Sequence, residues 1–145
     1  MSFRSLIVAC CLCAPGVGLA HSGAPEPLLP QSFNWMHPPH LPGVKGAWVV
    51  GDEASAAGYV FRVVLDKGAR IGPHTHPDTR HSTVLSGTLY VGFGETEEVA
   101  RMVAVPAGAA YVAPAGVPHY LRAPDGEVIY QEGGVGPTAT VPVRR

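Results

Sequence analysis

Two histidines separated by a single residue, His74 and His76, are the clearest chemical signal in this sequence of 145 residues. On a β-strand, residues i and i+2 point to the same face, so both imidazoles can reach one ion. Pro73 and Pro77 flank the pair and reduce the entropy that is lost when the rings are ordered. Short His-x-His motifs also occur in solvated loops, so a metal site needs further ligands from elsewhere in the chain.

The cysteines limit what else could bind such an ion. All three, Cys10, Cys11 and Cys13, lie near the start of the chain, in a segment that we expect to be removed. A metal in the mature protein must then have nitrogen and oxygen ligands. Imidazole nitrogen suits iron, zinc, nickel, copper and, less strongly, manganese. We therefore expect one divalent transition metal, with no preference among Fe, Zn, Mn, Ni and Cu.

Residues 1–20 are typical of a secretory signal peptide. Arg4 supplies a positive charge, residues 6–12 are apolar, and small residues precede an expected cleavage site after Ala20. The apolar run is too short to span a bilayer. Because the signal is of a bacterial kind, we expect an exported, periplasmic protein without a membrane anchor.

Residues 21–46 are rich in proline, whereas residues 47–145 have an all-β pattern. The proline-rich arm is expected to run extended across the surface of the domain. Beyond it, short runs rich in Val, Tyr and Phe alternate with glycine-containing turns. Eight strands are expected, near residues 47–50, 59–65, 82–86, 88–93, 99–105, 111–113, 119–122 and 128–131. This set predicts an all-β single domain, a jelly roll or small closed barrel.

The residues around the two histidines resemble the first motif of the cupin superfamily. That motif places a glycine, five residues, His-x-His, three or four residues, a glutamate, six residues and a glycine. This sequence has Gly68, five residues, His74 and His76, three residues, Arg80, six residues and Gly87. The first motif is therefore matched at every position except the glutamate.

The second cupin motif is matched further along the chain. It places a glycine, five residues, Pro-x-Gly, two residues and a histidine, and Gly108, Pro114, Gly116 and His119 fall at those spacings. The resemblance implies a cupin-type jelly-roll β-barrel in which His74, His76 and His119 are the metal ligands. It also implies a homodimer, because many small cupins pair through a barrel sheet.

Arg80 stands where cupins usually have the glutamate that completes the ligand set. A guanidinium cannot ligate a cation and would repel one nearby. Either Arg80 points away, or the site keeps three histidines with open coordination positions. A four-residue spacer would put His81 at the ligand position instead. Arg80 could also hold a substrate carboxylate, and His81 and Tyr120 are further candidates for substrate contact.

Three imidazoles with open positions resemble the iron sites of thiol dioxygenases on cupin folds. Neutral ligands leave the charge of the ion uncompensated, which favours a small anionic substrate. We therefore expect a metal-dependent dioxygenase, and the alternative is a non-catalytic periplasmic module that binds a small molecule or a metal. A metal-free cupin that binds an anion through Arg80 is disfavoured by the three intact histidines. Metal binding should weaken as pH falls through ~6.5, the ordinary histidine range.

Charge excludes one class of partner. The chain has 10 lysines and arginines against 11 aspartates and glutamates, a formal net charge of -1. This balance leaves no basic surface for nucleic acid. The partner that we expect is a small-molecule ligand or substrate.

Overall fold

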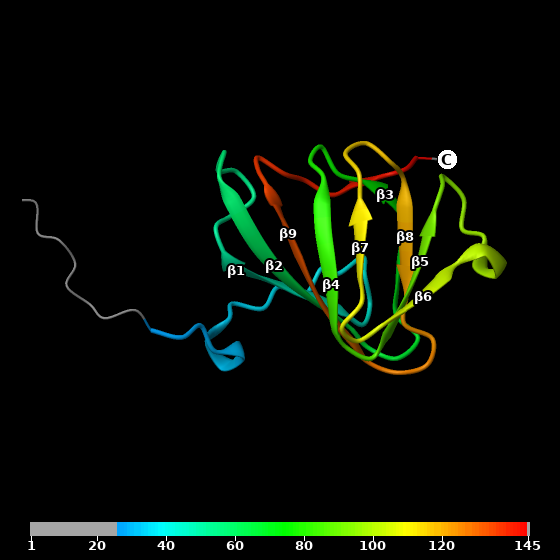
Figure 1. Cartoon of the computed structure of the whole chain (residues 1–145), viewed down its shortest axis with the longest axis horizontal. Coiled ribbons are helices and arrows are strands. Elements are labelled where there is room, and N and C mark those ends of the chain that lie inside the picture. The colour runs from blue at the N-terminus through cyan, green and yellow to red at the C-terminus, as the bar shows by residue number, and fades with distance from the viewer. Residues whose placement is uncertain (1–25, 145) are drawn as a thin grey trace, which may run out of the picture.

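The computed structural model describes residues 26–144, and its regular structure is almost entirely β (Figure 1). The signal peptide that we expect at residues 1–20 lies outside the described residues. The two helical elements are single 3-10 turns, η1 (Pro30–Ser32) and η2 (Val99–Arg101). Within the described range, no helix has the length and apolar character needed to cross a membrane.

Ten strands form two five-stranded antiparallel sheets that face each other (Figure 1). In spatial order the first sheet contains β1 (Val44–Val50), β2 (Gly58–Leu65), β9 (Val128–Val135), β4 (Arg80–Ser86) and β7 (Ala110–Ala113). The second contains β10 (Val141–Pro142), β3 (Arg70–Thr75), β8 (His119–Arg122), β5 (Thr88–Phe93) and β6 (Val103–Pro106).

The hydrophobic core lies between the two sheets. Leu65 and Val128 of the first sheet and Leu89 and Leu121 of the second are completely buried and belong to one cluster. Alternate residues of each strand supply these side chains, as the sequence pattern of a half-buried strand requires. The expected all-β jelly-roll barrel is therefore confirmed.

Strand β3 carries His74 and ends one residue before His76, and it was absent from the eight strands that we expected. Gly72 and Pro73 interrupt its pattern, and the register against β8 shifts between Ile71 and His74. Without a shift, residues three apart would face opposite sides of the sheet. The irregularity lets Ile71 pack against the core while His74 is also buried inside. Proline and glycine within strands are typical of such irregularities.

Several other expected boundaries differ from the structure; for example, β9 continues to Val135, four residues beyond its expected end. The strand expected over residues 99–105 begins as the 3-10 turn η2, and only β6 is extended. The first strand begins at Val44, three residues before its expected start at residue 47. The short strand β10, close to the C-terminus, was not expected from the sequence at all.

The described part of the proline-rich arm lies against the edge of the first sheet. Met36 exchanges two backbone hydrogen bonds with Gly46 of β1, at 2.8 and 3.0 Å. Leu41 packs against the hydrophobic core. Met36, Pro38, His40 and Leu41 of this arm line the cavity described below.

Candidate metal centre

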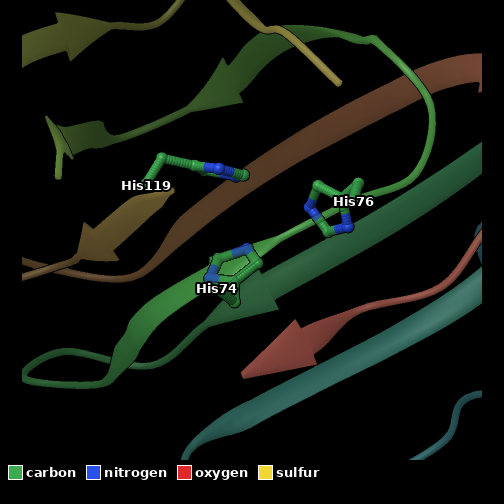
Figure 2. A group of neighbouring side chains, drawn as sticks. All are labelled: His74, His76 and His119. Carbon is green, nitrogen blue, oxygen red and sulfur yellow. The ribbon is translucent and has the colours of Figure 1, made fainter. Parts of the chain in front are cut away.

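Two strands of the second sheet bring the three histidines together. His74 lies near the end of β3, His76 directly follows that strand, and His119 begins β8. His74 and His119 are opposite each other in the β3–β8 register. Figure 2 shows the three rings turned toward a common space, and one nitrogen from each lies within 4.8 Å of the other two. All three side chains are buried, with residue exposures of 4%, 2% and 0%.

A backbone carbonyl fixes the orientation and tautomer of each ring. The Nδ1–H groups of His74, His76 and His119 donate to carbonyl oxygens at 2.8, 2.7 and 3.2 Å, respectively. Because a carbonyl can only accept, Nδ1 carries the proton and Nε2 keeps a free lone pair. The three acceptors are the carbonyls of Gly72, Ala139 and Val117.

The Nε2 atoms of His76 and His119 are buried and have no hydrogen-bond partner. Unpaired buried polar atoms are uncommon because each costs free energy. A divalent transition metal bound to the Nε2 lone pairs would satisfy them, and the second ring nitrogen already has the carbonyl partner that metal-binding histidines usually have. The donor set therefore fits the metal that the sequence predicts. Within residues 26–144, the cluster contains these three histidines and no carboxylate.

The electrostatics of the site keep the imidazoles neutral. Burial lowers the pKa of His74 to about 4, and the neighbouring His119 adds to the effect. Burial and the Arg80 guanidinium lower the pKa of His76 to about 3. Burial also lowers the pKa of His119. Protons therefore compete for these rings only in acid, so the expectation that binding weakens through pH ~6.5 is corrected to a range well below it.

Arg80 is buried beside the histidines, and its guanidinium is already bonded to the protein. One Nη atom donates to Glu132 of β9 at 2.6 Å. The other donates to the hydroxyl of Thr138 at 2.8 Å and to the Ala139 carbonyl at 3.4 Å. Asp78 lies 3.8 Å from Arg80 Nε. Of the two alternatives left by the sequence, a site with three histidines is the one that this geometry gives.

The segment after β9 connects Arg80 to the histidine cluster. The Ala139 carbonyl accepts from both Arg80 and His76. Thr138 accepts from Arg80 and donates to Asp78, which also accepts from the Tyr59 hydroxyl. Strand β10 then pairs with His74 and Thr75 of β3. The C-terminal segment therefore helps to hold the ligand-bearing strand and the His76 ring in place.

A cavity of about 570 Å³ adjoins two of the three histidines, His74 and His76. This volume is within the usual range for a small-molecule site. His74, His76, Arg80 and Glu132 are the buried polar residues of its wall. The rest of its wall comes from the arm, β1, β2, β3, the C-terminal segment and nearby residues, namely Met36, Pro38, His40, Leu41, Val44, Lys45, Gly46, Glu53, Phe61, Val63, Ile71, Gly72, Pro73, Tyr130, Thr140 and Pro142.

Comparison with protein families decides the identity of this barrel. A family model described as "Cupin domain" matches residues 61–134, just over half of the chain. The chain is a cupin. No curated protein sequence matches it.

Solved structures share the fold of this cupin at low sequence identity. The polyketide cyclase RemF from Streptomyces resistomycificus is 13% identical, with a TM-score of 0.69 over 84% of this chain and 87% of that one. KdgF from Halomonas sp. is 21% identical, with a TM-score of 0.60 over 84% and 96%. A salicylate 1,2-dioxygenase from Pseudaminobacter salicylatoxidans is 15% identical, with a TM-score of 0.58 over 71% of this chain and 31% of that one.

The structure does not bring His81 or Tyr120 to the cavity of this cupin. His81 is exposed, between the buried Arg80 and Ser82, because successive residues of β4 face opposite sides of the sheet. Tyr120 is buried, but its ring lies against Gly92, and its hydroxyl accepts from the backbone N–H of Glu98 at 2.9 Å. Tyr120 therefore fixes the turn η2 to the outside of the second sheet.

Sequence reasoning missed Glu132, Thr138 and Ala139. Glu132 could have been found, since Val128 and Tyr130 of the same strand are buried and residues two apart share a face. A buried carboxylate needs a cationic or hydrogen-bonding partner. Arg80, which occupies the position of the usual cupin glutamate, could have been recognised as that partner. Thr138 and Ala139 lie outside any regular strand, so no periodicity indicated their role.

Proposed function

We propose that this cupin binds one divalent transition metal on His74, His76 and His119 and acts as a metal-dependent dioxygenase on a small molecule held in the adjoining cavity. The observation that supports this most strongly is the convergence of the three imidazoles, with Nε2 of His76 and His119 buried and unpaired. Three protein ligands leave coordination positions open, which is typical of catalytic rather than structural metal sites. A bound metal would supply Lewis acidity and, as iron, redox chemistry.

The protein's own groups would perform three tasks in such a reaction. The Gly72, Val117 and Ala139 carbonyls hold the rings in the metal-binding tautomer. The buried walls exclude bulk water from the histidines. The cavity positions the substrate beside them, which lowers the entropic part of the barrier. The salicylate dioxygenase with the same fold is consistent with this chemistry, although its 15% identity extends only to the fold.

Oxygen uptake tests the proposed activity. The proposed reaction adds both atoms of O₂ to the organic substrate, whose own electrons reduce the oxygen, so no external reductant is needed. The iron(II)-loaded protein should be assayed by oxygen electrode with a panel of catechols, hydroxylated aromatic compounds and thiols, beside a His119→Ala variant. We expect uptake of one O₂ per molecule of one substrate, with two ¹⁸O atoms in its product. A protein that binds iron but takes up no oxygen with any of these classes would contradict the dioxygenase.

A non-catalytic binding module is the second candidate. It is favoured by the missing carboxylate, because the described residues bring no replacement for it into the histidine cluster. Such a module would bind metal and small molecules without turnover. Both functions require the metal, but only the dioxygenase consumes oxygen. The oxygen assay therefore separates the two functions.

We further propose that the protein works in the periplasm. The support for this is the signal-like pattern of residues 1–20. A homodimer likewise stays a prediction from the cupin resemblance.

A further inference from the structure

We propose that the cavity takes a small molecule with an apolar, uncharged body and one polar end, and that the polar end faces the three histidines. This inference rests on the proposed function, because the polar end is assigned to the metal. It replaces the small anionic substrate, held by Arg80, that the sequence led us to expect.

Apolar side chains form most of the cavity wall beyond the histidines. Met36 and Leu41 come from the arm, Phe61 and Val63 from β2, and Ile71 and Pro73 from β3. A ligand body that covers these groups gains about 25 cal/mol for each Å² of apolar surface removed from water. The volume of about 570 Å³ accommodates a molecule the size of two fused aromatic rings with space to spare.

Arg80 is not free to hold a second anionic group. Its two Nη atoms donate to Glu132 at 2.6 Å and to Thr138 at 2.8 Å, and its Nε, which has no hydrogen-bond partner, lies 3.8 Å from Asp78. Two carboxylates thus surround one buried cation. Another anion placed here would lose its hydration and would meet Glu132 at close range without a free counter-charge.

The other charges of the wall do not supply an anion site either. The Lys45 ammonium lies 5.2 Å above the centre of the Trp35 ring, a cation–π geometry. Glu53 lines the same cavity and carries a charge of opposite sign to that of Lys45. The third ionisable group of the outer wall, His40, is exposed on the arm. Among the described lining residues, the lysine and arginine cations are therefore Arg80, which is paired with Glu132, and Lys45, which lies over Trp35.

A matched pair of probes tests this preference. Both 2,3-dihydroxynaphthalene and its 6-sulfonate can present two adjacent oxygens to a metal, but only the second has an anionic group on the body. Calorimetric titrations use zinc-loaded protein, because zinc has no redox chemistry. We expect the uncharged probe to bind at least tenfold more tightly. Equal affinity, or tighter binding of the sulfonate, would overturn the inference.

The variant Glu132→Gln examines the cause of the discrimination. Glutamine keeps an oxygen that can accept from Arg80 but removes one of the two negative charges. We expect the sulfonate to gain at least fivefold in affinity relative to the uncharged probe. An unchanged ratio in the folded variant would show that the Arg80–Glu132 pair does not exclude anions.

The location of the ligand body is tested by Ile71→Phe, which narrows the cavity. The matched control is Arg70→Phe, at the preceding position of β3, where the side chain is exposed and outside the cavity. We expect Ile71→Phe to weaken the uncharged probe at least fivefold and Arg70→Phe to leave it unchanged. Equal effects of the two variants would place the body elsewhere and contradict the proposal.

Titrations of metal-free protein separate this inference from the proposed function. The preference for the uncharged probe comes from the wall and should persist without zinc. Tighter binding of that probe in the presence of zinc comes from the histidine site. Loss of the preference refutes the inference, whereas a preference without any effect of zinc refutes the assignment of the polar end to the metal.

Discussion

Replacement of His76 by alanine is expected to weaken zinc binding by more than about 100-fold. Changes in residues that merely support a metal ligand cost 10–100-fold, and His76 itself supplies one of three converging nitrogens. Its Nε2 is buried without another partner, so no neighbouring group compensates for its loss. Isothermal titration calorimetry of the native protein and the variant measures the difference.

The control is His81→Ala, which removes an exposed imidazole from strand β4 of the other sheet. The His81→Ala variant should bind zinc as tightly as the native protein does. It also tests whether His81 is a metal ligand, the alternative that the motif spacing left open. The titrations are best made at pH 7 and at pH 5.5. Because the pKa values of His74 and His76 are lowered to about 4 and about 3, native binding should persist at the lower pH. Strong zinc binding by His76→Ala would contradict the site.

Glu132→Ala is expected to lower the free energy of unfolding by about 3–5 kcal/mol, because removal of one partner leaves a buried charge uncompensated. The side chains of Arg80 and Glu132 are only 6% and 4% exposed, and their contact is 2.6 Å. Burial by itself would lower the pKa of Arg80, but the attraction of the Glu132 carboxylate outweighs this effect. The pKa of Arg80 therefore lies above its ordinary value. Urea unfolding followed by tryptophan fluorescence gives the free energy.

Two further variants distinguish an unpaired charge from simple loss of packing. The double variant Arg80→Met with Glu132→Leu removes both charges and should recover most of the lost stability. Glu97→Ala breaks the pair with Arg70, whose side chain is 64% exposed, and should cost less than about 1 kcal/mol. If Glu132→Ala were no more costly than Glu97→Ala, the buried pair would not have the structural role assigned to it.

The barrel could be predicted from the sequence because its signals are local. Alternating apolar residues indicated most strands, and the motif glycines mark turns that only glycine makes easily. Gly87, between β4 and β5, has a φ of +77°, and a Cβ there would lie 2.3 Å from the Glu127 carbonyl oxygen. Strand β3 was missed because Gly72 and Pro73 interrupt its alternation of apolar and polar residues. His74 and His76 nevertheless face the same space, as the period of a strand predicts.

The three histidines could likewise be predicted, since motif spacing places them on paired strands. The partners of Arg80 could not. Glu132 is 52 residues from Arg80 in sequence, and Thr138 is 58 residues away, so the contacts depend on the pairing of β9 with β4. The sequence therefore left a substrate carboxylate as one candidate partner of Arg80, whereas the fold gives it the carboxylate of Glu132.

The most direct test of the three-histidine centre is the zinc X-ray absorption spectrum of the protein loaded with one equivalent of zinc. We expect three nitrogen ligands at about 2.0–2.1 Å with the outer scattering of imidazole rings, and a remaining oxygen ligand from water. A first shell of oxygen atoms alone, or of a single imidazole, would contradict a metal site built from His74, His76 and His119.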